Sequence, residues 1–368
     1  MTPKLLMAGD AGSVHFFRWA GFARRAGFSV DVLSYERPGK MDPTLNYAAH
    51  RLLRRSSTRL SKVLSIVLDI FRVNHPSYVL ANFHYLTPRW AAYVLARRGP
   101  SLITCWGSDI LVHYQRARGL VKALLRGALR KAAAITCDSE DVRRLVGEAA
   151  GRPEKVHLVY WGVDMGRFSV TLEARNAARR RYEIPPDSTV ILSVRRATPH
   201  FQLEQLIDWF ASTIRDPRVI LFLHVVSDLE PEYASRCLQR ASGVPNIRVN
   251  TRKLDTDEML ELYAFSDIDI HNPVSDATPV SMLEGIACRN LVLCCEGIEA
   301  YRDLARLYAI EFFRSLDEVT EERIRRMQAG KDRVTEKNLE VLKNTHSEAR
   351  TIEALAGILR SLTEGREG

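Results

Sequence analysis

Two carboxylates lie eight positions apart in the segment SDATPVSMLEGIAC, residues 275–288. Pro279 is typical of a helix start, because a proline there has no N–H group to leave unpaired. We therefore expect a helix from about Val280, with Asp276 before its first turn and Glu284 a little over one turn inside it. Unpaired N–H groups at a helix start bind phosphate. The segment predicts a phosphate site beside two acidic side chains that could accept hydrogen bonds from hydroxyl groups.

Polar side chains also follow three other apolar segments. RRATPHFQ (195–202) comes directly after STVILSV, and its arginines could neutralise a phosphate group. In the first half of the chain, ANFHY (81–85) and ITCWGSDI (103–110) each end an apolar segment. The glycines of GDAGS (9–13) match no full dinucleotide fingerprint, so on their own they are a weak signal.

One pattern imitates a metal site. Asp267-Ile268-Asp269 spells a DxD motif, but it spans a predicted helix end and a buried strand. No His/Cys cluster has the spacing of a zinc site, and no GxSxG or Walker pattern is present. The six cysteines include no CxxC pair, which favours reduced, buried thiols in a cytosolic protein. We expect neither a metal nor a cofactor.

Short apolar segments alternate with helical patterns along the chain, which is typical of βαβ units with a parallel sheet. Strands are expected at 4–9, 28–34, 77–83, 101–106, 131–137 and 155–161, and again at 188–194, 218–226, 246–250, 268–272 and 290–295. The fold class is therefore α/β, with two Rossmann-like doubly wound domains. We place them at 1–165 and 166–345, followed by a helix at 346–368 that packs back on the first domain. Ligands of such sheets bind beyond the carboxyl ends of the strands, so the cleft between the domains is the expected site.

Composition and charge exclude several protein classes. The 368 residues are 46% hydrophobic and 26% charged, as in globular proteins, and no apolar run approaches the roughly 18 residues of a membrane span. The N-terminus reaches Asp10 before a signal-peptide core could form, so we expect a cytoplasmic protein. The net charge of +9 divides into +13 for residues 1–165 and −4 for the remainder. The first domain is therefore expected to face an anionic partner.

Part of this positive charge suits one face of a helix. If residues 51–71 are helical, one side carries Arg51, Arg55, Arg59 and Lys62. The opposite side carries an apolar stripe that we expect to pack on the sheet, namely Leu53, Leu60, Leu64, Val67 and Phe71. The basic side at 51–62 suits an anionic membrane surface, and it also suits a soluble anionic acceptor.

The segment at 275–288 resembles the acid-x7-Glu motif of family 4 glycosyltransferases, which are retaining, nucleotide-sugar-dependent enzymes of the GT-B fold. The resemblance implies that Glu284 holds the ribose hydroxyls of the nucleotide. It implies that Asp276 and the backbone of 277–279 hold hydroxyls of the donor sugar. Further donor contacts are expected at the helix start and in the first loop of the chain, from Gly12, Thr278, Val280, Ser281 and Met282.

RRATPHFQ resembles the basic motif of the same family, Arg-x-x-Pro-x-Lys-Gly, with Arg196 and Pro199 in register. The resemblance implies that Arg196 binds the diphosphate. Phe201 stands where the family usually has lysine, which removes one cation from the site, and a glutamine follows where the family has glycine. Arg195 or His200 could supply the missing charge, and the sequence leaves both open.

Segments of the first half resemble other parts of the family pattern. ITCWGSDI resembles the HGSD segment, with Trp106 where histidine is commonest, and residues 11–34 resemble the first loop, helix and second strand. YWGVDMGRF (160–168) resembles the Gly-Val-Asp-x-x-x-Phe signature at the domain crossover. The acceptor or cleft candidates are His15, His84, Trp106 and Asp109. For the histidine at 84, a buried core position is an equally good interpretation.

We therefore expect a retaining glycosyltransferase that moves a sugar from a nucleotide diphosphate donor to an acceptor hydroxyl without a metal. A UDP-sugar is the first choice of donor and a GDP-sugar the second. The acceptor is a glycan, a lipid-linked acceptor or a small metabolite, and the expected catalytic residues are Arg196, Asp276 and Glu284. One alternative is a GT-B nucleotide-sugar epimerase, which needs an acid/base pair that we do not find. The other is a non-catalytic nucleotide-sugar-binding or nucleic-acid-binding protein. The basic segment lacks interleaved surface aromatic residues and any known nucleic-acid module, so no nucleic-acid partner is expected.

Overall fold

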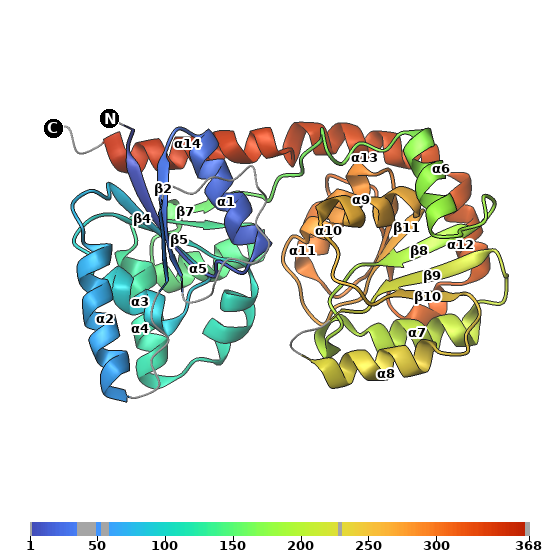
Figure 1. Cartoon of the computed structure of the whole chain (residues 1–368), viewed down its shortest axis with the longest axis horizontal. Coiled ribbons are helices and arrows are strands. Elements are labelled where there is room, and N and C mark those ends of the chain that lie inside the picture. Colours follow the sequence, from blue (N-terminus) through green and yellow to red (C-terminus); the bar gives the residue numbers. More distant parts are fainter. Residues whose placement is uncertain (1, 35–48, 53–58, 227–229, 365–368) are drawn as a thin grey trace. The chain divides into compact units, whose positions relative to one another are not determined.

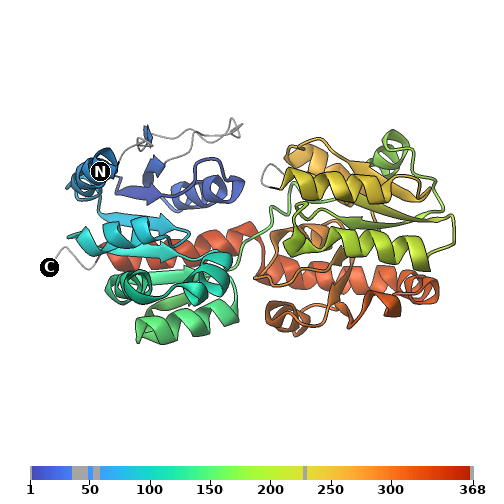
Figure 2. The same ribbon diagram turned by 90° about the horizontal axis from the view of Figure 1, so that it is seen from below.

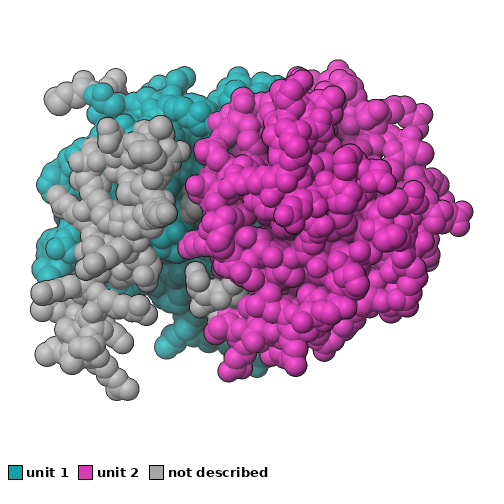
Figure 3. Space-filling view, turned by 45° about the vertical axis from the view of Figure 1, so that its right-hand side comes forward, with its two compact units in different colours: residues 1–161, 348–368 teal, residues 162–347 magenta. Residues whose placement is uncertain are grey.

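The computed structural model describes residues 2–34, 49–52, 59–226 and 230–364. The chain divides into two compact units, which Figure 3 colours separately. Unit 1 contains residues 1–161 and 348–368, and unit 2 contains residues 162–347. Each unit has its own parallel sheet and its own buried apolar core, as expected for two α/β domains.

In the described residues, the sheet of unit 1 has seven parallel strands in the order β3-β2-β1-β4-β5-β6-β7. Figure 1 labels β2, β4, β5 and β7 of this sheet. Its strands are β1 (Lys4–Ala8), β2 (Ser29–Ser34), β3 (Ala49–Leu52), β4 (Leu80–His84), β5 (Ser101–Thr104), β6 (Ala134–Cys137) and β7 (Val156–Leu158). The central strands β4 and β5 are buried along their whole length, because helices cover both sides of the sheet (Figure 2). The strand order reverses between β1 and β4, so ligands are expected near the loops after these two strands.

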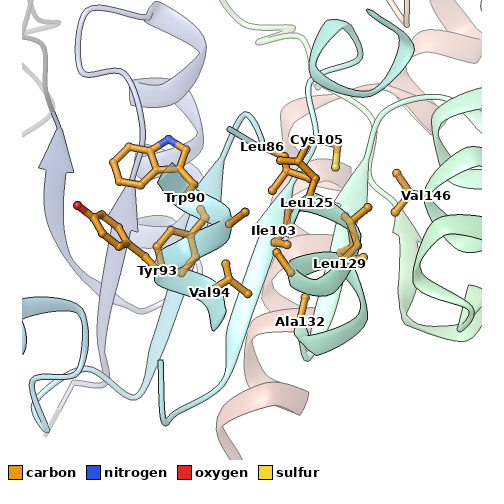
Figure 4. Close-up of a cluster of buried hydrophobic side chains, with 14 of the residues drawn as sticks. Leu86, Trp90, Tyr93, Val94, Ile103, Cys105, Leu125, Leu129, Ala132 and Val146 are labelled. Atoms are coloured by element: carbon orange, nitrogen blue, oxygen red, sulfur yellow. The ribbon is translucent and has the colours of Figure 1, made fainter. Parts of the chain in front are cut away.

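Helices of unit 1 cover its sheet from both sides. α1 (Val14–Arg25) packs with the C-terminal α14 (Glu348–Glu364), while α2 (Arg59–Val73), α3 (Pro88–Ala96), α4 (Gly119–Lys131) and α5 (Glu140–Ala150) pack on one another in sequence. A π-helical segment, Asp109–Tyr114, and a 3₁₀ turn, Pro153–Lys155, complete the unit. Figure 4 shows the core under α3 and α4, where Trp90, Tyr93 and Val94 meet Ile103 and Leu125. Burial of each such side chain stabilises the fold by ~1.5–3 kcal/mol.

The sheet of unit 2 has six parallel strands in the order β10-β9-β8-β11-β12-β13. They are β8 (Thr189–Ser193), β9 (Val219–His224), β10 (Ile247–Asn250), β11 (Ile268–His271), β12 (Leu291–Cys295) and β13 (Glu311–Phe313). Here the order reverses between β8 and β11, which pair directly with Ile191 opposite Ile268. The carboxyl ends of these two strands mark the expected ligand position of the unit.

The helices of unit 2 also lie on both faces of their sheet. α7 (Leu203–Thr213) packs with α8 (Pro231–Ala241), α6 (Leu172–Arg181) packs with α9 (Thr256–Phe265), and α10 (Val280–Ala287) packs with α13 (Lys331–Thr345). The remaining helices are α11 (Glu299–Ala305), α12 (Glu321–Ala329) and the 3₁₀ turns Pro199–Phe201 and Leu316–Glu318. The described helices include none that is both long and apolar enough to cross a membrane.

Every strand predicted from the sequence is present, but the edge strands β3 and β13 were not predicted. β13 has three residues, and β3 reads Ala-His-Arg-Leu, so neither has the run of apolar residues that indicates a buried strand. Edge strands need fewer apolar residues because one of their sides has no neighbouring strand. Sequence periodicity therefore identifies the central strands better than the edges.

The predicted helix over 51–71 is wrong at its start. Ala49–Leu52 form the strand β3, residues 53–58 lie outside the described part of the chain, and α2 begins at Arg59. The basic face proposed at 51–62 is therefore not one helical face. The side chains of residues 51–65 lie outside the described part of the chain.

The predicted apolar stripe of this helix is also wrong where the structure describes it. Val67 and Phe71 are 43% and 72% exposed, whereas Ile66 and Ile70 pack against the core. The inward face contains Asp69, whose carboxylate accepts hydrogen bonds from Arg72 at 2.6 Å and from Tyr93 at 3.1 Å. Ile66, Ile70 and Val73 therefore form the apolar face that packs on the core, with Asp69 among them.

The two units divide after Trp161 and after Ser347, a few residues from the boundaries expected at 165 and 345. Within unit 2 the two crossing segments pair, because the N–H of Val163 donates to the carbonyl of His346 at 2.8 Å. α14 belongs to unit 1, where Glu348 forms ion pairs with Arg18 and Arg25 of α1. The acceptor and donor roles assigned to the two domains stay predictions.

Candidate active site

The motif residues of unit 2 meet at the carboxyl ends of two neighbouring strands. β8 ends at Ser193, two residues before Arg195, and β11 ends at His271, where a loop leads to α10. These strands pair at the point where the strand order reverses. Side chains 81 positions apart in the sequence therefore reach hydrogen-bonding distance. The topology, rather than any local motif, brings the two motifs together.

The helix start predicted at Val280 is present, with Pro279 at the N-cap of α10. A proline cap has no side-chain acceptor, so first-turn N–H groups can bind another partner. The expected donor contact from the N–H of Met282 is wrong, because this group donates to the carbonyl of Pro279 at 3.1 Å, which leaves those of Val280 and Ser281 as the candidates. Met282, Leu283 and Ile286 are fully buried and hold the helix against the core. Thr278 and Val280 are also buried, and Ser281 is half-buried. The result is a rigid helix start that suits an anionic group.

Asp276 is the centre of a hydrogen-bond network before this helix. Its Oδ2 accepts from Nη2 of Arg195 at 2.7 Å and from the hydroxyl of Tyr301 at 2.9 Å, and its Oδ1 accepts from the N–H of Ala277 at 3.1 Å. The side chains of Asp276 and Arg195 are 16% and 12% exposed. Burial raises the pKa of Tyr301 well above its ordinary value, so its hydroxyl stays a donor to the carboxylate. Three donors therefore hold this acid in one orientation.

The basic motif is divided between two arginines in the structure. Nη1 of Arg195 donates to Oγ of Ser281 at 3.0 Å, and its guanidinium lies over the ring of Phe201, 4.2 Å from the centroid. Arg196 points to an exposed position. His200 donates from Nε2 to the carbonyl of Ser275 at 2.6 Å. Of the two candidates for the missing cation, the arginine lies at the start of α10 and the histidine joins two loops.

Glu284 lies half-buried one turn inside α10. The hydroxyl of Tyr263 donates to its Oε2 at 3.3 Å, and burial raises the pKa of this tyrosine well above its ordinary value. Since the tyrosine cannot ionise near neutral pH, it can only donate to the carboxylate. The arrangement leaves a fixed carboxylate that could accept hydrogen bonds from two neighbouring hydroxyl groups.

The residue after this glutamate is Gly285, and no larger residue fits at that position. A Cβ atom at Gly285 would lie 1.5 Å from Oδ2 of Asp269. Asp269 is 3% exposed, and Nδ2 of Asn290 donates to its Oδ1 at 3.2 Å. Burial raises the pKa of Asp269 well above its ordinary value. Close packing of α10 on β11 therefore requires glycine directly after Glu284.

In unit 1, the loop after β1 places Gly12 at an exposed position, where its N–H donates to Oδ1 of Asp10 at 2.7 Å. His15 is exposed, with its ring 6.1 Å from the ring of Trp106 and 5.2 Å from that of Trp161, measured between centroids. The structure therefore brings two of the candidates in this unit, at 15 and 106, into one aromatic group at the carboxyl edge of the sheet.

His84 lies inside the unit rather than at its surface. The side chain is 0% exposed, and Nε1 of Trp106 donates to its Nδ1 at 3.3 Å. Burial lowers the pKa of His84 to about 3, so the ring is neutral. Of the two interpretations that the sequence left open, the structure favours the buried histidine, which orients the half-buried indole of Trp106.

Asp109 is buried as well and holds the backbone around it. Its carboxylate accepts from the N–H of Leu86 at 2.8 Å and from the N–H of Trp106 at 3.0 Å. Burial raises the pKa of Asp109 to about 6. The acid joins the loops after β4 and β5, and at 1% exposure it acts on a ligand only through the loops that it positions.

Both acids of the DxD pattern contact other parts of the protein. Asp267 accepts from Arg175 at 2.6 Å, Arg179 at 2.8 Å and Lys331 at 2.6 Å, while Asp269 lies under α10. Three cations around one carboxylate repel a metal ion. In the described part of the chain, no group of three or more His, Cys, Asp or Glu side chains is placed to hold a metal.

Sequence reasoning missed two site residues, Tyr263 and Tyr301. Both are fully buried and donate to the motif carboxylates, the first to Glu284 and the second to Asp276. Each lies on a helix, and the apolar pattern of that helix predicts only that the tyrosine is a core residue. No spacing relates them to the motif, so only the packing of α9 and α11 identifies their contacts.

Comparison with known proteins supports the same interpretation. Residues 4–139 match the family model described as "Glycosyl transferase 4-like". Among curated proteins, D-inositol 3-phosphate glycosyltransferase 2 of Catenulispora acidiphila is 26% identical over 329 residues. The match covers 76% of this chain and 73% of that protein.

Solved structures share the fold over nearly the whole chain. HepE of Anabaena, in complex with UDP and glucose, has a TM-score of 0.79 at 14% identity and covers 98% of this chain and 100% of its own. A glycosyltransferase of Rickettsia africae has a TM-score of 0.80 at 15% identity, with 100% of both chains covered. Sucrose-phosphate synthase of Thermosynechococcus elongatus has a TM-score of 0.77 at 14% identity, with 99% and 100% covered. At these identities the likeness shows the fold alone.

Proposed function

We propose that this chain is a family 4 glycosyltransferase of the GT-B fold, which transfers a sugar from a UDP-sugar to an acceptor hydroxyl with retention of the anomeric configuration. A GDP-sugar is the second choice of donor. The proposal assigns donor binding to unit 2 and acceptor binding to unit 1.

The observation that carries the proposal is the geometry at the start of α10. Asp276 and Arg195 form a pair of 2.7 Å beside the first turn, and Glu284 follows one turn later. In the proposed complex the diphosphate lies at the helix start, Glu284 accepts hydrogen bonds from the ribose hydroxyls, and Asp276 contacts the donor sugar. Arg196 reaches the diphosphate from its exposed position in the loop after β8.

The reaction requires stabilisation of the negative charge that develops on the departing diphosphate. As the bond to the anomeric carbon breaks, the sugar becomes positively charged and the leaving group more negative. Arginine side chains and a helix start are preorganised for that charge, and such groups contribute most where water is excluded. With retention, the acceptor hydroxyl attacks from the face that the diphosphate leaves, so no protein nucleophile is required.

The donor choice follows the relatives. HepE was solved with UDP and glucose, and also with UDP-glucose. The acceptor is a glycan, a lipid-linked acceptor or a small metabolite. The name of the Catenulispora relative makes an inositol phosphate one small metabolite to test, and the positive charge of unit 1 suits an anionic acceptor.

The proposal is tested by incubating the protein with UDP-, GDP- and TDP-sugars and an acceptor panel that includes inositol 3-phosphate. Nucleotide release and the anomeric configuration of the product are measured. We expect release of UDP and a product that keeps the donor configuration. An inverted product would refute retention, and formation of an epimerised nucleotide sugar would favour the epimerase alternative.

We propose that the reaction needs no metal. The electrostatic groups at the helix start carry the charge that a metal–diphosphate pair carries elsewhere, so EDTA should leave initial rates within about twofold. The measurement uses the enzyme after chelation and again after addition of Mn²⁺. Restoration of a chelated, inactive enzyme by Mn²⁺ would show that the prediction is wrong.

We propose that unit 1 binds an anionic membrane surface through the layer formed by α2, α3 and α4. Between residues 43 and 137 the acidic residues are Asp69 and Asp109, and both are 1% exposed. Phe71 on α2 and Leu120 on α4 are 72% and 89% exposed. The same stretch of sequence contains exposed basic residues, namely Arg72, Arg98, Arg116, Arg118, Arg126, Arg130 and Lys131. Each basic residue near an anionic surface contributes ~1 kcal/mol.

Vesicle sedimentation tests the membrane proposal. At ~20 mM salt, where screening is weak, the protein should sediment with vesicles that contain phosphatidylglycerol but not with phosphatidylcholine alone. The double variant Phe71→Ser/Leu120→Ser should bind less, and Leu172→Ser, at a 68% exposed position of unit 2, is the matched control. Retention that ignores lipid charge, or none at all, would leave a soluble anionic acceptor as the better explanation of the charge.

A further inference from the structure

We propose that Arg195, supported by the ring of Phe201, supplies the second cation of the diphosphate site, in place of the lysine that the basic motif would have at 201. The inference rests on the proposed function. It adds a binding residue that lies outside the motif register, since Arg196 is the arginine in register. It also gives Phe201 a role, which is to hold a charged group rather than to carry one.

The two unusual residues of the motif touch each other. The guanidinium carbon of Arg195 lies 4.2 Å from the ring centroid of Phe201, a distance typical of cation–π stacking. Phe201 ends a 3₁₀ turn, Pro199–Phe201, that brings its ring back over the loop after β8. A lysine at 201 would place an ammonium where the ring now lies. The phenyl ring instead carries the guanidinium of a neighbour.

The guanidinium is aimed at the start of α10. Nη1 donates to Oγ of Ser281, the second residue of the helix, at 3.0 Å, and Nη2 donates to Asp276 at 2.7 Å. An arginine has five N–H donors, so these two bonds leave others for a phosphate oxygen. The side chain is 12% exposed, which strengthens its interaction with a bound anion. The guanidinium and the helix N–H groups therefore converge on one phosphate position.

The carboxylate of Asp276 does not abolish the proposed role of Arg195, because other groups also donate hydrogen bonds to this carboxylate. Tyr301 donates to the same Oδ2 at 2.9 Å, and the N–H of Ala277 donates to Oδ1 at 3.1 Å. Asp276 thus orients the guanidinium while part of its own charge is balanced elsewhere. The imidazole of His200, the other candidate, donates to the carbonyl of Ser275 and fixes the loop instead.

The test measures nucleotide binding by titration calorimetry, so it does not depend on the unknown acceptor. Affinities for UDP and UMP are compared, or for GDP and GMP if the wild type prefers guanine. Arg195→Gly should weaken UDP binding about 10- to 100-fold, as expected for loss of a charge-assisted contact, and UMP binding much less. Phe201→Ala should weaken UDP binding about two- to fivefold, since it removes only the support.

The decisive variant exchanges the two residues. Phe201→Lys in the Arg195→Gly background restores a cation beside the helix, so UDP affinity should return to within about fivefold of the wild type. Arg252→Gly is the matched control, because Arg252 is an exposed arginine in the loop after β10 that pairs with Glu258 of α9. It should leave UDP affinity unchanged. If Arg195→Gly does not fold, Arg195→Gln takes its place in every comparison.

The outcomes separate this inference from the proposed function. A wild type that binds neither UDP nor GDP would overturn the proposed function and this inference with it. A wild type that binds UDP, together with an Arg195→Gly variant that keeps its affinity, would overturn the inference alone. So would an equal loss for UDP and UMP, or a double variant that stays as weak as Arg195→Gly.

Discussion

Glu284 and Arg196 test the site at the scale of single residues. Losing a charge-assisted contact to the donor costs ~2–4 kcal/mol. We therefore expect Glu284→Ala and Arg196→Ala each to lower turnover ~30-fold or more, with nearly unchanged thermal stability because both side chains are at least partly exposed. Steady-state rates and melting temperatures measure the two effects. Full activity of Glu284→Ala would refute the assignment of the ribose-binding residue.

Gly285 supports a second residue-scale prediction, on stability. Gly285→Ala places a methyl group 1.5 Å from Oδ2 of the buried Asp269, and overpacking of this kind costs ~1–3 kcal/mol. Urea denaturation gives the free energy of unfolding. Combining the variant with Asp269→Ala removes the clash and should recover part of the loss, whereas additive losses would contradict this reason.

Gly357→Ala is the matched control for that experiment. Gly357 lies in α14, and a Cβ atom there meets nothing within 4 Å. Alanine is favoured over glycine in a helix interior by ~1 kcal/mol. The same substitution should therefore stabilise the protein at 357 and destabilise it at 285, which separates a steric effect from a general effect of removing a glycine.

At the scale of elements, Asp267 connects four parts of unit 2. It is the residue before β11, it accepts from Arg175 and Arg179 of α6 and from Lys331 of α13, and the N–H of Val190 in β8 donates to it at 2.9 Å. Burial alone would raise the pKa of Asp267, but Lys331 and Arg175 hold it below its ordinary value. The carboxylate is a structural centre rather than a metal ligand.

Asp267→Asn should therefore destabilise unit 2 by ~3–5 kcal/mol, because it leaves buried cations without their counter-charge. Asp257→Asn is the matched control. Asp257 is 77% exposed and pairs with Arg167 at the surface, so its loss should cost less than ~1 kcal/mol. Both are measured by chemical denaturation. Equal stability of the two variants would show that the network around Asp267 does not hold the helices to the sheet.

At the scale of the whole molecule, buried histidines make the fold sensitive to acid. Burial lowers the pKa of His84 to about 3 and the pKa values of His224 and His346 to about 4, from an ordinary 6.5. The unfolded chain binds protons near pH 6.5 and the folded chain does not. Stability is therefore fully present above pH 6.5 and is lost as pH falls toward 4.

The two units should differ in this loss. In unit 1, Asp109 opposes His84, because a carboxyl group with a raised pKa of about 6 gains stability when it is protonated. Asp269 opposes the histidines of unit 2 in the same way, but that unit contains three with lowered pKa values, His224, His271 and His346. Asp267 of unit 2 also has a lowered pKa and loses its ion pairs in acid. Hydrogen exchange at pH 7 and pH 5 should show that unit 2 loses protection first. Earlier loss in unit 1 would contradict the assignment of these groups.

Local patterns in the sequence determined the order of the central strands and helices along the chain, and also the residue at which α10 begins. Buried parallel strands need continuous apolar runs, and a proline before an apolar helix marks a helix start wherever the chain goes. Those signals lie within a few residues of each other. For the same reason the motif resemblance placed Asp276 and Glu284 correctly on either side of the helix start.

Only the tertiary structure decided which side chains meet. Arg195 reaches Asp276 across 81 positions because β8 and β11 are neighbours in the sheet, and a periodic pattern carries no information about that pairing. The burial of His84 likewise depends on a distant partner, Trp106, and the outward position of Phe71 depends on which face of α2 packs against the core. Contacts between distant segments follow from the packing of the whole unit, so no single segment of the sequence specifies them.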